Sequence, residues 1–302
     1  MRFARRFIWR NLKLSAILTV EHLSYAYGGS TPFTADALKD VSFEVQSGEI
    51  VGIIGHTGSG KSTLVQQLNG LLKPTDGKVL LSGKDIWENP KEIRKIRSQI
   101  GLVFQYPEYQ LFEETVYADI AFGPKNMGLS GQELDVRIRE ICALVGVPED
   151  YFERSPLDLS GGEKRRVAIA GVMAMRPNVI VFDEPLAGLD PRGRTRVLRM
   201  ISEYRAAYGA TVLIGSHSME DMARLADRLL VLNDGNLVLF DTVEQVFTKA
   251  DLLREIGLDI PVTARVFEAL RRRGADVPDN IFTVDAAVRY LTEQKRGGGA
   301  LA

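Results

Sequence analysis

Short apolar runs alternate with predicted helices along most of the chain. Short runs rich in Val, Ile, Leu and Phe, at 50–54, 179–182 and 211–214, lack polar alternation. Strands with this pattern are typically buried on both faces of a sheet. Between them, segments such as 192–208 are predicted helices. Strands that alternate with helices predict an α/β protein with a parallel sheet covered on both faces.

Two regions differ from this pattern: the chain before the apolar run at 50–54, and the stretch at about 105–160. Strands are predicted at 17–25 and 41–45, ahead of the first buried run. After a predicted strand at 100–104 comes a long stretch without strong strand signals, in which a helix starts at Ser130 and Glu133 is placed for a capping box. We therefore expect an antiparallel β-subdomain near the N-terminus and a helical insert at about 105–160.

The C-terminal part changes character again. Asp234 and Gly235 predict a hairpin turn into a strand at 237–240. Beyond about 249, short helical segments are predicted around 262–270 and 284–291. The predicted organisation is a basic tail at 1–15, a main domain at 16–248, and a small helical appendage with a disordered tail at 249–302.

Composition narrows the possible functions. The 302 residues include 38 basic and 39 acidic side chains and carry a net charge of −1, which gives no electrostatic reason to expect nucleic-acid binding. No apolar run approaches the ~18 residues that span a bilayer, so a soluble or peripheral protein is expected. The lone Cys142 lies on an apolar stripe with Ile138, Ile141 and Val145, which predicts a buried thiol.

A glycine-rich loop carries the clearest chemical signal. Residues 55–62, GHTGSGKS, lie between the predicted strand at 50–54 and a helix that opens at Lys61. In such a loop, backbone N–H groups surround phosphate oxygens, the lysine reaches the β and γ phosphates, and the serine hydroxyl binds Mg²⁺. The predicted nucleotide-binding residues of this loop are Gly55, His56, Thr57, Gly58, Ser59, Gly60, Lys61, Ser62 and Thr63.

Two carboxylates follow another apolar strand. Asp183 and Glu184 come at the end of the run at 179–182, where ligands bind in open α/β sheets. We expect Asp183 to help hold Mg²⁺ and Glu184 to accept a proton from the attacking water or to orient it. Without the phosphate loop elsewhere in the chain, the same pair would be interpreted as two acidic residues that face solvent at the end of a strand.

Further motifs resemble those of ABC transporter ATPases over about residues 17–247. The segment Leu159-Ser160-Gly161-Gly162-Glu163 is similar to the ABC signature, although Ser160 and Glu163 are also placed for a plain capping box. The resemblance implies that Ser160, Gly161, Gly162 and Asp190 complete the nucleotide site of the opposite subunit. It also implies that Gln105 is a catalytic residue and Mg²⁺ ligand, that His217 is the switch histidine, and that Tyr27 stacks on adenine, with Tyr25 as an alternative. The fold that it implies is a RecA-like P-loop NTPase domain.

Finer features are similar to one branch of this family, the energy-coupling factor transporter ATPases, and to the second of their two paired subunits. These features are the Tyr25-Ala26-Tyr27 segment, Thr57, the segments at 106–112, 122–124 and 187–193, and Ser155-Pro156. Departures from the usual pattern are Leu186, Glu163 and Ser216. The resemblance implies hydrolysis of ATP with Mg²⁺, a second ATPase subunit, a transmembrane scaffold and, indirectly, a substrate-capture membrane protein for a vitamin or metal ion, at the cytoplasmic side of the cell membrane.

Two other functions remain open at this point. One is the ATPase of a conventional ABC importer, and the other is a soluble ABC ATPase that acts on nucleic acid or ribosomes. A last hypothesis concerns coupling to the membrane. Acidic residues border an apolar surface after Gln105 and are expected to receive a basic helix of the scaffold; they are Glu108, Glu113, Glu114 and Asp119.

Overall fold

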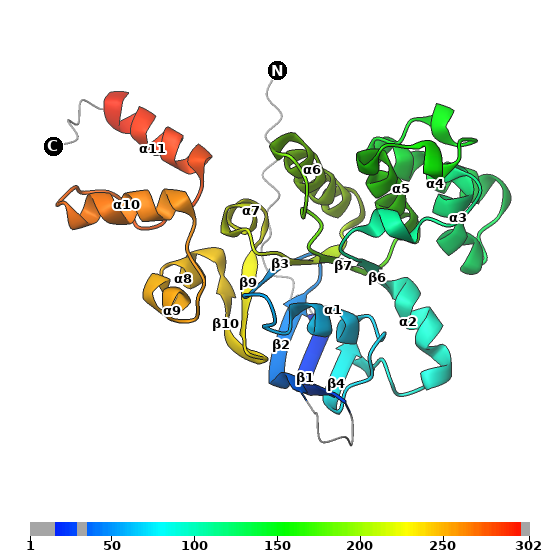
Figure 1. Ribbon diagram of the computed structural model, residues 1–302, viewed down its shortest axis with the longest axis horizontal. Helices are drawn as coiled ribbons and strands as arrows, with labels where there is room; N and C mark the ends of the chain where they lie inside the picture. Colours follow the sequence, from blue (N-terminus) through cyan, green and yellow to red (C-terminus); the bar gives the residue numbers. More distant parts are fainter. Residues whose placement is uncertain (1–15, 29–34, 297–302) are drawn as a thin grey trace.

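Two β-sheets form the framework of the protein, whose computed structural model describes residues 16–28 and 35–296 (Figure 1). The first sheet is antiparallel, in the order β2-β1-β4-β5. The second has the order β10-β9-β3-β8-β7-β6 and is parallel except for β10. The strands are β1 (Ala16–Tyr27), β2 (Ala35–Gln46), β3 (Ile50–Ile54), β4 (Asp76–Leu81), β5 (Lys84–Asp85), β6 (Ile100–Val103), β7 (Val179–Asp183), β8 (Thr211–Gly215), β9 (Arg228–Asn233) and β10 (Asn236–Thr242).

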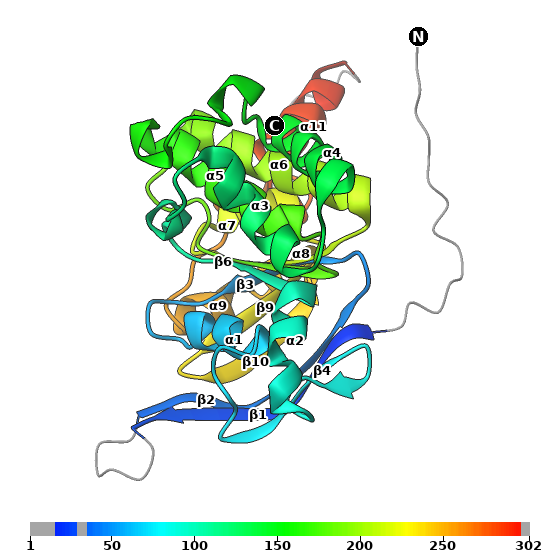
Figure 2. The same ribbon diagram turned by 90° about the vertical axis from the view of Figure 1, so that its right-hand side faces the viewer.

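Helices cover both faces of the parallel sheet. Figure 2 shows α1 and α2 on the side facing the antiparallel sheet, and α3 to α7 on the opposite side. Leu64, Val65 and Leu68 of α1 are buried in one apolar cluster with residues of both sheets. The helices are α1 (Lys61–Leu68), α2 (Ile93–Gln99), α3 (Val116–Asn126), α4 (Gly131–Val145), α5 (Gly161–Ala174), α6 (Pro191–Tyr208), α7 (Met219–Leu225), α8 (Val243–Phe247), α9 (Ala250–Glu255), α10 (Val262–Arg272) and α11 (Val284–Arg296), with short 3₁₀ turns at Pro90–Glu92, Pro107–Gln110, Glu149–Tyr151 and Pro156–Asp158.

The predicted α/β architecture is confirmed. The uninterrupted apolar runs at 50–54 and 179–182 form β3 and β7, whose residues are buried throughout. Strands β4 and β5 were not predicted, because the turn residues before them obscured a strand of only six residues. Pairing with β1, in which Leu18 lies opposite Leu81, stabilises β4. A hydrogen bond from the Lys39 N–H to the Gly235 carbonyl, 2.8 Å long, connects the two sheets.

The helical layer contains more than the predicted insert. Helix α5 begins after residue 160 but packs on α3 and α4, so the layer continues through α5. The predicted capping box at the start of α4 is wrong: among the described residues the Ser130 side chain makes no cap hydrogen bond. Glu133 turns instead toward Arg137, one helical turn later, at 3.8 Å.

The thiol in the same helix behaves as expected. The prediction of a buried Cys142 is confirmed, and burial raises the pKa of its thiol to about 12. A thiol with this pKa stays protonated and unreactive near neutral pH.

The C-terminal helices divide between two apolar clusters. Leu253, Leu258 and Ile260 are buried in the main cluster, together with residues of the parallel sheet and of α3 to α7. Phe267, Val277 and Ile281 form a small separate cluster between α10 and α11. The division at residue 248 stays a prediction, and packing ties the first part of the appendage to the main domain. The predicted basic tail at 1–15 lies outside the described residues, and among the described helices none is long and apolar enough to cross a membrane.

Candidate functional site

Three strands bring the candidate site together at one edge of the parallel sheet. Strands β3, β7 and β8 are parallel neighbours and end at Ile54, Asp183 and Gly215. The loops that follow them therefore meet at the same edge, as expected for ligand sites in α/β proteins.

The glycine loop at 55–62 follows β3 and opens α1. Gly58 and Gly60 have φ angles of 84° and 103°, which residues other than glycine rarely adopt. A Cβ at Gly60 would lie 2.5 Å from the Ala37 carbonyl oxygen of β2. The loop therefore depends on glycine both for its backbone conformation and for its close approach to β2.

Lys61 is buried within this loop. Its ammonium group donates hydrogen bonds to the carbonyl oxygens of Gly55 at 2.6 Å and His56 at 3.0 Å. Burial lowers the pKa of Lys61, and the negative charges of Glu184 and Asp183 oppose that change. The positive charge is thus held inside the loop and faces the two carboxylates at the end of β7.

Asp183 has the features of a cation ligand. Its side chain is 6% exposed, and its Oδ1 atom has no hydrogen-bond partner among the described residues. Burial raises the pKa of Asp183, whereas a hydrogen bond with the Ser62 side chain and the charge of Lys61 lower it. A buried carboxylate oxygen beside a hydroxyl group is a donor set that suits a hard divalent cation.

Glu184 and His217 form a pair at the opening of the site. Glu184 has a φ angle of 49°, a left-handed conformation that is strained for a residue other than glycine. Its Oε2 atom lies 2.9 Å from Nδ1 of His217, and the Glu184 side chain is 16% exposed against 71% for His217. The strained backbone thus directs a largely buried carboxylate toward an exposed imidazole.

These groups line one cavity of about 400 Å³. The predicted residues in its lining are Gly55, His56, Thr57, Lys61, Glu184 and His217. Met219, Gly257, Leu258 and Asp259 also line it and were not predicted. Of the predicted residues that the structure describes, Gln105 and Asp183 do not line the cavity; Gln105 is exposed two residues after the end of β6, and Asp183 is buried at the end of β7.

The two tyrosines near this loop have different environments. Tyr27 is 43% exposed, and its hydroxyl lies 3.2 Å from Oγ1 of Thr63. Tyr25 is partly buried and packs edge-on against Tyr27, with 4.9 Å between ring centroids. Tyr27 therefore presents an accessible ring beside the start of α1, and its contact with adenine stays a prediction.

The signature segment lies at the exposed start of α5, outside the cavity. A Cβ added at Gly161 or Gly162 would meet no heavy atom of the described residues within 4 Å. The Glu163 carboxylate accepts hydrogen bonds from the Ser160 N–H at 2.8 Å and the Ser160 hydroxyl at 2.6 Å. It also accepts one from the Tyr151 hydroxyl at 2.8 Å. Hydrogen bonds from Ser160 and Tyr151 lower the pKa of Glu163 to about 2. These hydrogen bonds hold the negatively charged Glu163 side chain against the start of its own helix.

Asp190 occupies a comparable position at the start of α6. Its side chain accepts a hydrogen bond from the Gly193 N–H at 2.7 Å and caps the helix. Among the described residues, neither Asp190 nor the signature segment lines the cavity.

Arg165 is a residue that sequence reasoning missed. Its side chain is 4% exposed and forms an ion pair with Glu108 at 3.1 Å. It also donates a hydrogen bond to the Ala187 carbonyl at 2.9 Å. Arg165 therefore joins the signature helix to the segments after β6 and β7. Its position could have been predicted, because it lies on the same face of α5 as the apolar residues Ile169 and Met173.

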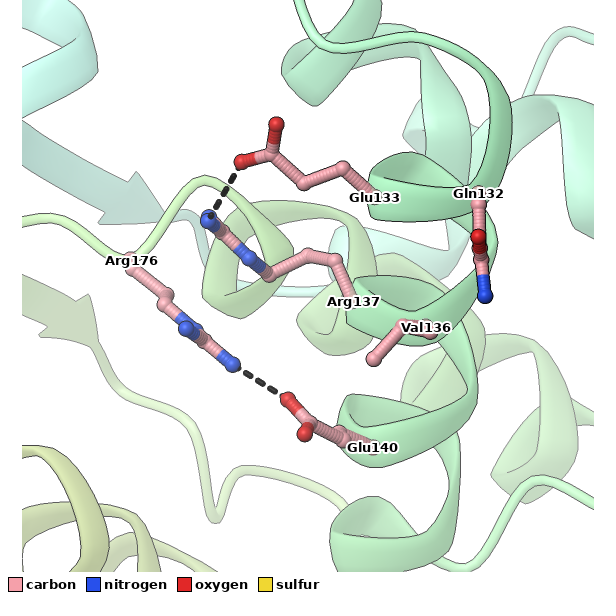
Figure 3. A pocket seen from close by; sticks show the side chains of 6 residues that line it. All are labelled: Gln132, Glu133, Val136, Arg137, Glu140 and Arg176. Carbon is pink, nitrogen blue, oxygen red and sulfur yellow. Dashed lines mark hydrogen bonds and ion pairs between the residues drawn. The ribbon is translucent and has the colours of Figure 1, made fainter.

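A second hollow, of about 450 Å³, lies beside α4 (Figure 3). Figure 3 shows Arg137 directed toward Glu133 and Arg176 directed toward Glu140. Both arginines are therefore neutralised by carboxylates in the same wall. Among the described residues, no group of three or more His, Cys, Asp or Glu side chains is placed to hold a metal ion.

Comparisons with known proteins agree with this geometry. The sequence model of the ABC transporter family matches residues 38–187. An energy-coupling factor transporter ATP-binding protein EcfA2 from Caldanaerobacter subterraneus subsp. tengcongensis is 49% identical over 280 residues, covering 93% of this chain and 98% of that protein. The protein of the same name from Clostridium acetobutylicum is 47% identical and covers 92% of this chain and 99% of its own length.

Solved structures show the same fold. CbiO1 from Clostridium perfringens, described as part of the ABC transporter complex CbiONQ, matches with a TM-score of 0.70 and 38% identity over 80% of this chain and 94% of that one. A dimeric ATP-binding cassette in a post-hydrolysis state, bound to ADP and Pi, matches with a TM-score of 0.68 and 28% identity over 75% of this chain and 98% of that one.

Proposed function

Because the chain belongs to the energy-coupling factor ATP-binding proteins of the ABC transporters, we propose that the cavity beside Lys61 receives the phosphates of ATP and is the site of hydrolysis. The chain is an ABC-type ATPase. The observation that carries the proposal is the convergence of the Lys61 loop and the Glu184–His217 pair on one cavity.

The chain's own residues divide the chemistry among them. Backbone N–H groups of the loop and Lys61 bind the phosphate oxygens and oppose the charge that develops on them. Glu184 orients the attacking water or accepts its proton, and His217 holds that carboxylate through the bond to Nδ1. Tyr27, whose hydroxyl lies 3.2 Å from Oγ1 of Thr63, would stack on the adenine ring.

Mg²⁺ fits the end of β7. Ser62, Asp183 and Gln105 would hold it, and the observation in favour is the buried, unpartnered Oδ1 of Asp183 among the described residues. When bound, the ion neutralises phosphate charge.

A second ATPase subunit completes the site in this proposal. Ser160, Gly161, Gly162 and Asp190 lie outside the cavity of their own chain, and the glycines have open space above them. A helix start with accessible N–H groups attracts anions. These residues would therefore contact the nucleotide held by the partner, in a sandwich of two ATPase subunits with two nucleotides.

The surface that would bind the transmembrane scaffold is apolar. Tyr109, Phe112 and Phe122 are 85%, 65% and 44% exposed, and the rings of Phe112 and Phe122 meet edge-on at 4.9 Å. Two of the acidic residues predicted to border this apolar surface also make contacts within the chain. Glu108 is used in the ion pair with Arg165, and Asp119 accepts hydrogen bonds from the backbone of Phe112 and Glu113. The aromatic side chains would therefore supply most of the contact.

The ATPase would act at the cytoplasmic face of the membrane. Through such a scaffold and a substrate-capture protein, ATP hydrolysis would drive uptake of a vitamin or metal ion. The relatives' names favour this importer type over a conventional ABC importer and over a soluble ABC ATPase acting on nucleic acid or ribosomes.

Co-purification tests the membrane role. Replacing both Tyr109 and Phe112 by Ala is expected to weaken co-purification with the membrane scaffold by about ten-fold or more, whereas basal ATP hydrolysis stays close to that of the unmodified protein. Val284→Ala and Val288→Ala on α11 provide a matched loss of exposed apolar area elsewhere. A Tyr109→Ala, Phe112→Ala protein that assembles and supports uptake normally would refute this surface.

A further inference from the structure

The loop between α9 and α10 reaches the proposed hydrolysis site. Gly257, Leu258 and Asp259 line the same cavity as Glu184 and His217, although they belong to the C-terminal appendage. Gly257 has a φ angle of 76°, which turns the chain sharply at the end of α9. We name residues 257–259 the cavity loop.

The cavity loop is packed firmly in place. Leu258 and Ile260 are 8% and 4% exposed and share an apolar cluster with Met219, the first residue of α7. Asp259 accepts a hydrogen bond from the Ile260 N–H at 2.8 Å and forms an ion pair with Arg265 at 2.7 Å. The loop and Met219, two residues after His217, therefore line the same cavity and belong to the same apolar cluster.

Helix α7 is held from two sides. Asp221 pairs with Arg194 of α6 at 2.5 Å, and Glu220 accepts a hydrogen bond from the Val262 N–H, at the start of α10, at 3.1 Å. A helix of seven residues has few internal hydrogen bonds, so these outside contacts determine where it sits. His217 precedes this helix and is itself 71% exposed, with its ring bonded to Glu184.

We propose that the cavity loop, together with the Glu220–Val262 hydrogen bond, is a positioning element that sets His217 against Glu184 for ATP hydrolysis. The proposal rests on the role given to His217 above. In this proposal these residues act by fixing the start of α7 and not by contact with the reacting atoms. A displacement of the appendage would move His217 relative to Glu184, so the C-terminal helices gain an influence on the hydrolysis step.

Paired substitutions test this role. Glu220→Ala removes the acceptor, whereas Glu220→Gln keeps an oxygen that accepts the same N–H. We expect Glu220→Ala to lower kcat about three- to ten-fold with KM for ATP within about two-fold, because one positioning contact is lost and phosphate binding is not. Glu220→Gln is expected to restore most of kcat. Leu258→Ala and Leu258→Met form a second pair with the same expectation, in case one alanine variant fails to fold.

The His217→Ala background separates the two proposals. If the element acts through His217, Glu220→Ala adds little further loss in that background. A full additional loss, an unchanged kcat in both folded alanine variants, or a Glu220→Gln protein as slow as Glu220→Ala would overturn the positioning role. A normal kcat in His217→Ala alone would instead refute the role of His217.

Discussion

The cavity at the end of the parallel sheet and the signature segment at the start of α5 differ in how complete they are. In the cavity, Lys61, Glu184 and His217 are brought close by three neighbouring strands, and most of their polar atoms already have partners. At the start of α5, Gly161 and Gly162 face open space. In the proposed function, one chain would therefore supply a formed phosphate site and, separately, an open helix start that would bind the phosphate held by a partner.

The sharpest test of this contrast alters the unfilled surface. Ser160→Arg is expected to reduce phosphate release to background without unfolding the protein, because a bulky cation at the helix start blocks the partner's nucleotide. Ser130→Arg is the matched control, since Ser130 also precedes a helix of the same layer and is exposed.

Mixing variants then shows in which subunit Ser160 acts. In a dimer of Ser160→Arg with Glu184→Gln, one site has an intact Glu184 and an intact partner Ser160, so part of the activity should return. Absence of any recovery in verified mixed dimers would contradict the two-subunit site.

Within the cavity, Glu184→Gln tests the chemistry. It is expected to retain ATP binding but to lower turnover by about 10²-fold or more, roughly 3 kcal/mol of barrier. Lys61→Ala should weaken nucleotide binding as well, as measured by titration with a fluorescent nucleotide. Glu203→Gln, on the exposed side of α6, serves as control. Near-normal phosphate release by Glu184→Gln would remove this residue from the mechanism.

Arg165 connects the two regions, and its loss should affect stability. Arg165→Ala leaves Glu108 without its partner in a largely buried position and is expected to lower the free energy of unfolding by about 2 kcal/mol. Urea unfolding measures this. A double variant, Arg165→Met with Glu108→Gln, should recover part of the loss, whereas equal losses in both proteins would show that the ion pair is not responsible.

The smallest expected effect concerns acid. The pKa of Glu163 is lowered to about 2 in the folded protein, from an ordinary value of 4.5. A carboxylate with a lowered pKa stabilises the fold above its ordinary pKa, and that contribution disappears as pH falls through the folded value. The Tm difference between the unmodified protein and Glu163→Gln should therefore shrink between pH 4.5 and 2. A constant difference would contradict the lowered pKa.

Local features were predictable where the chain carries them within a few consecutive residues. The loop at 55–62 and the pair Asp183-Glu184 were located because a strand, a turn and a helix start follow directly in the sequence. Strand β4 was missed because its pattern is short and begins in turn residues. Arg165 and the cavity loop were missed because their partners lie far away in the chain.

The sequence by itself determined the α/β architecture, the phosphate loop and the identity of the carboxylates, because local backbone preferences and apolar periodicity act over a few residues. Only the tertiary structure decided which of these groups meet. Packing placed Glu184 against His217, 33 residues apart. It also paired Arg165 with Glu108 and brought Leu258 of the appendage to the cavity, since contacts between distant segments depend on how the sheets and helices stack.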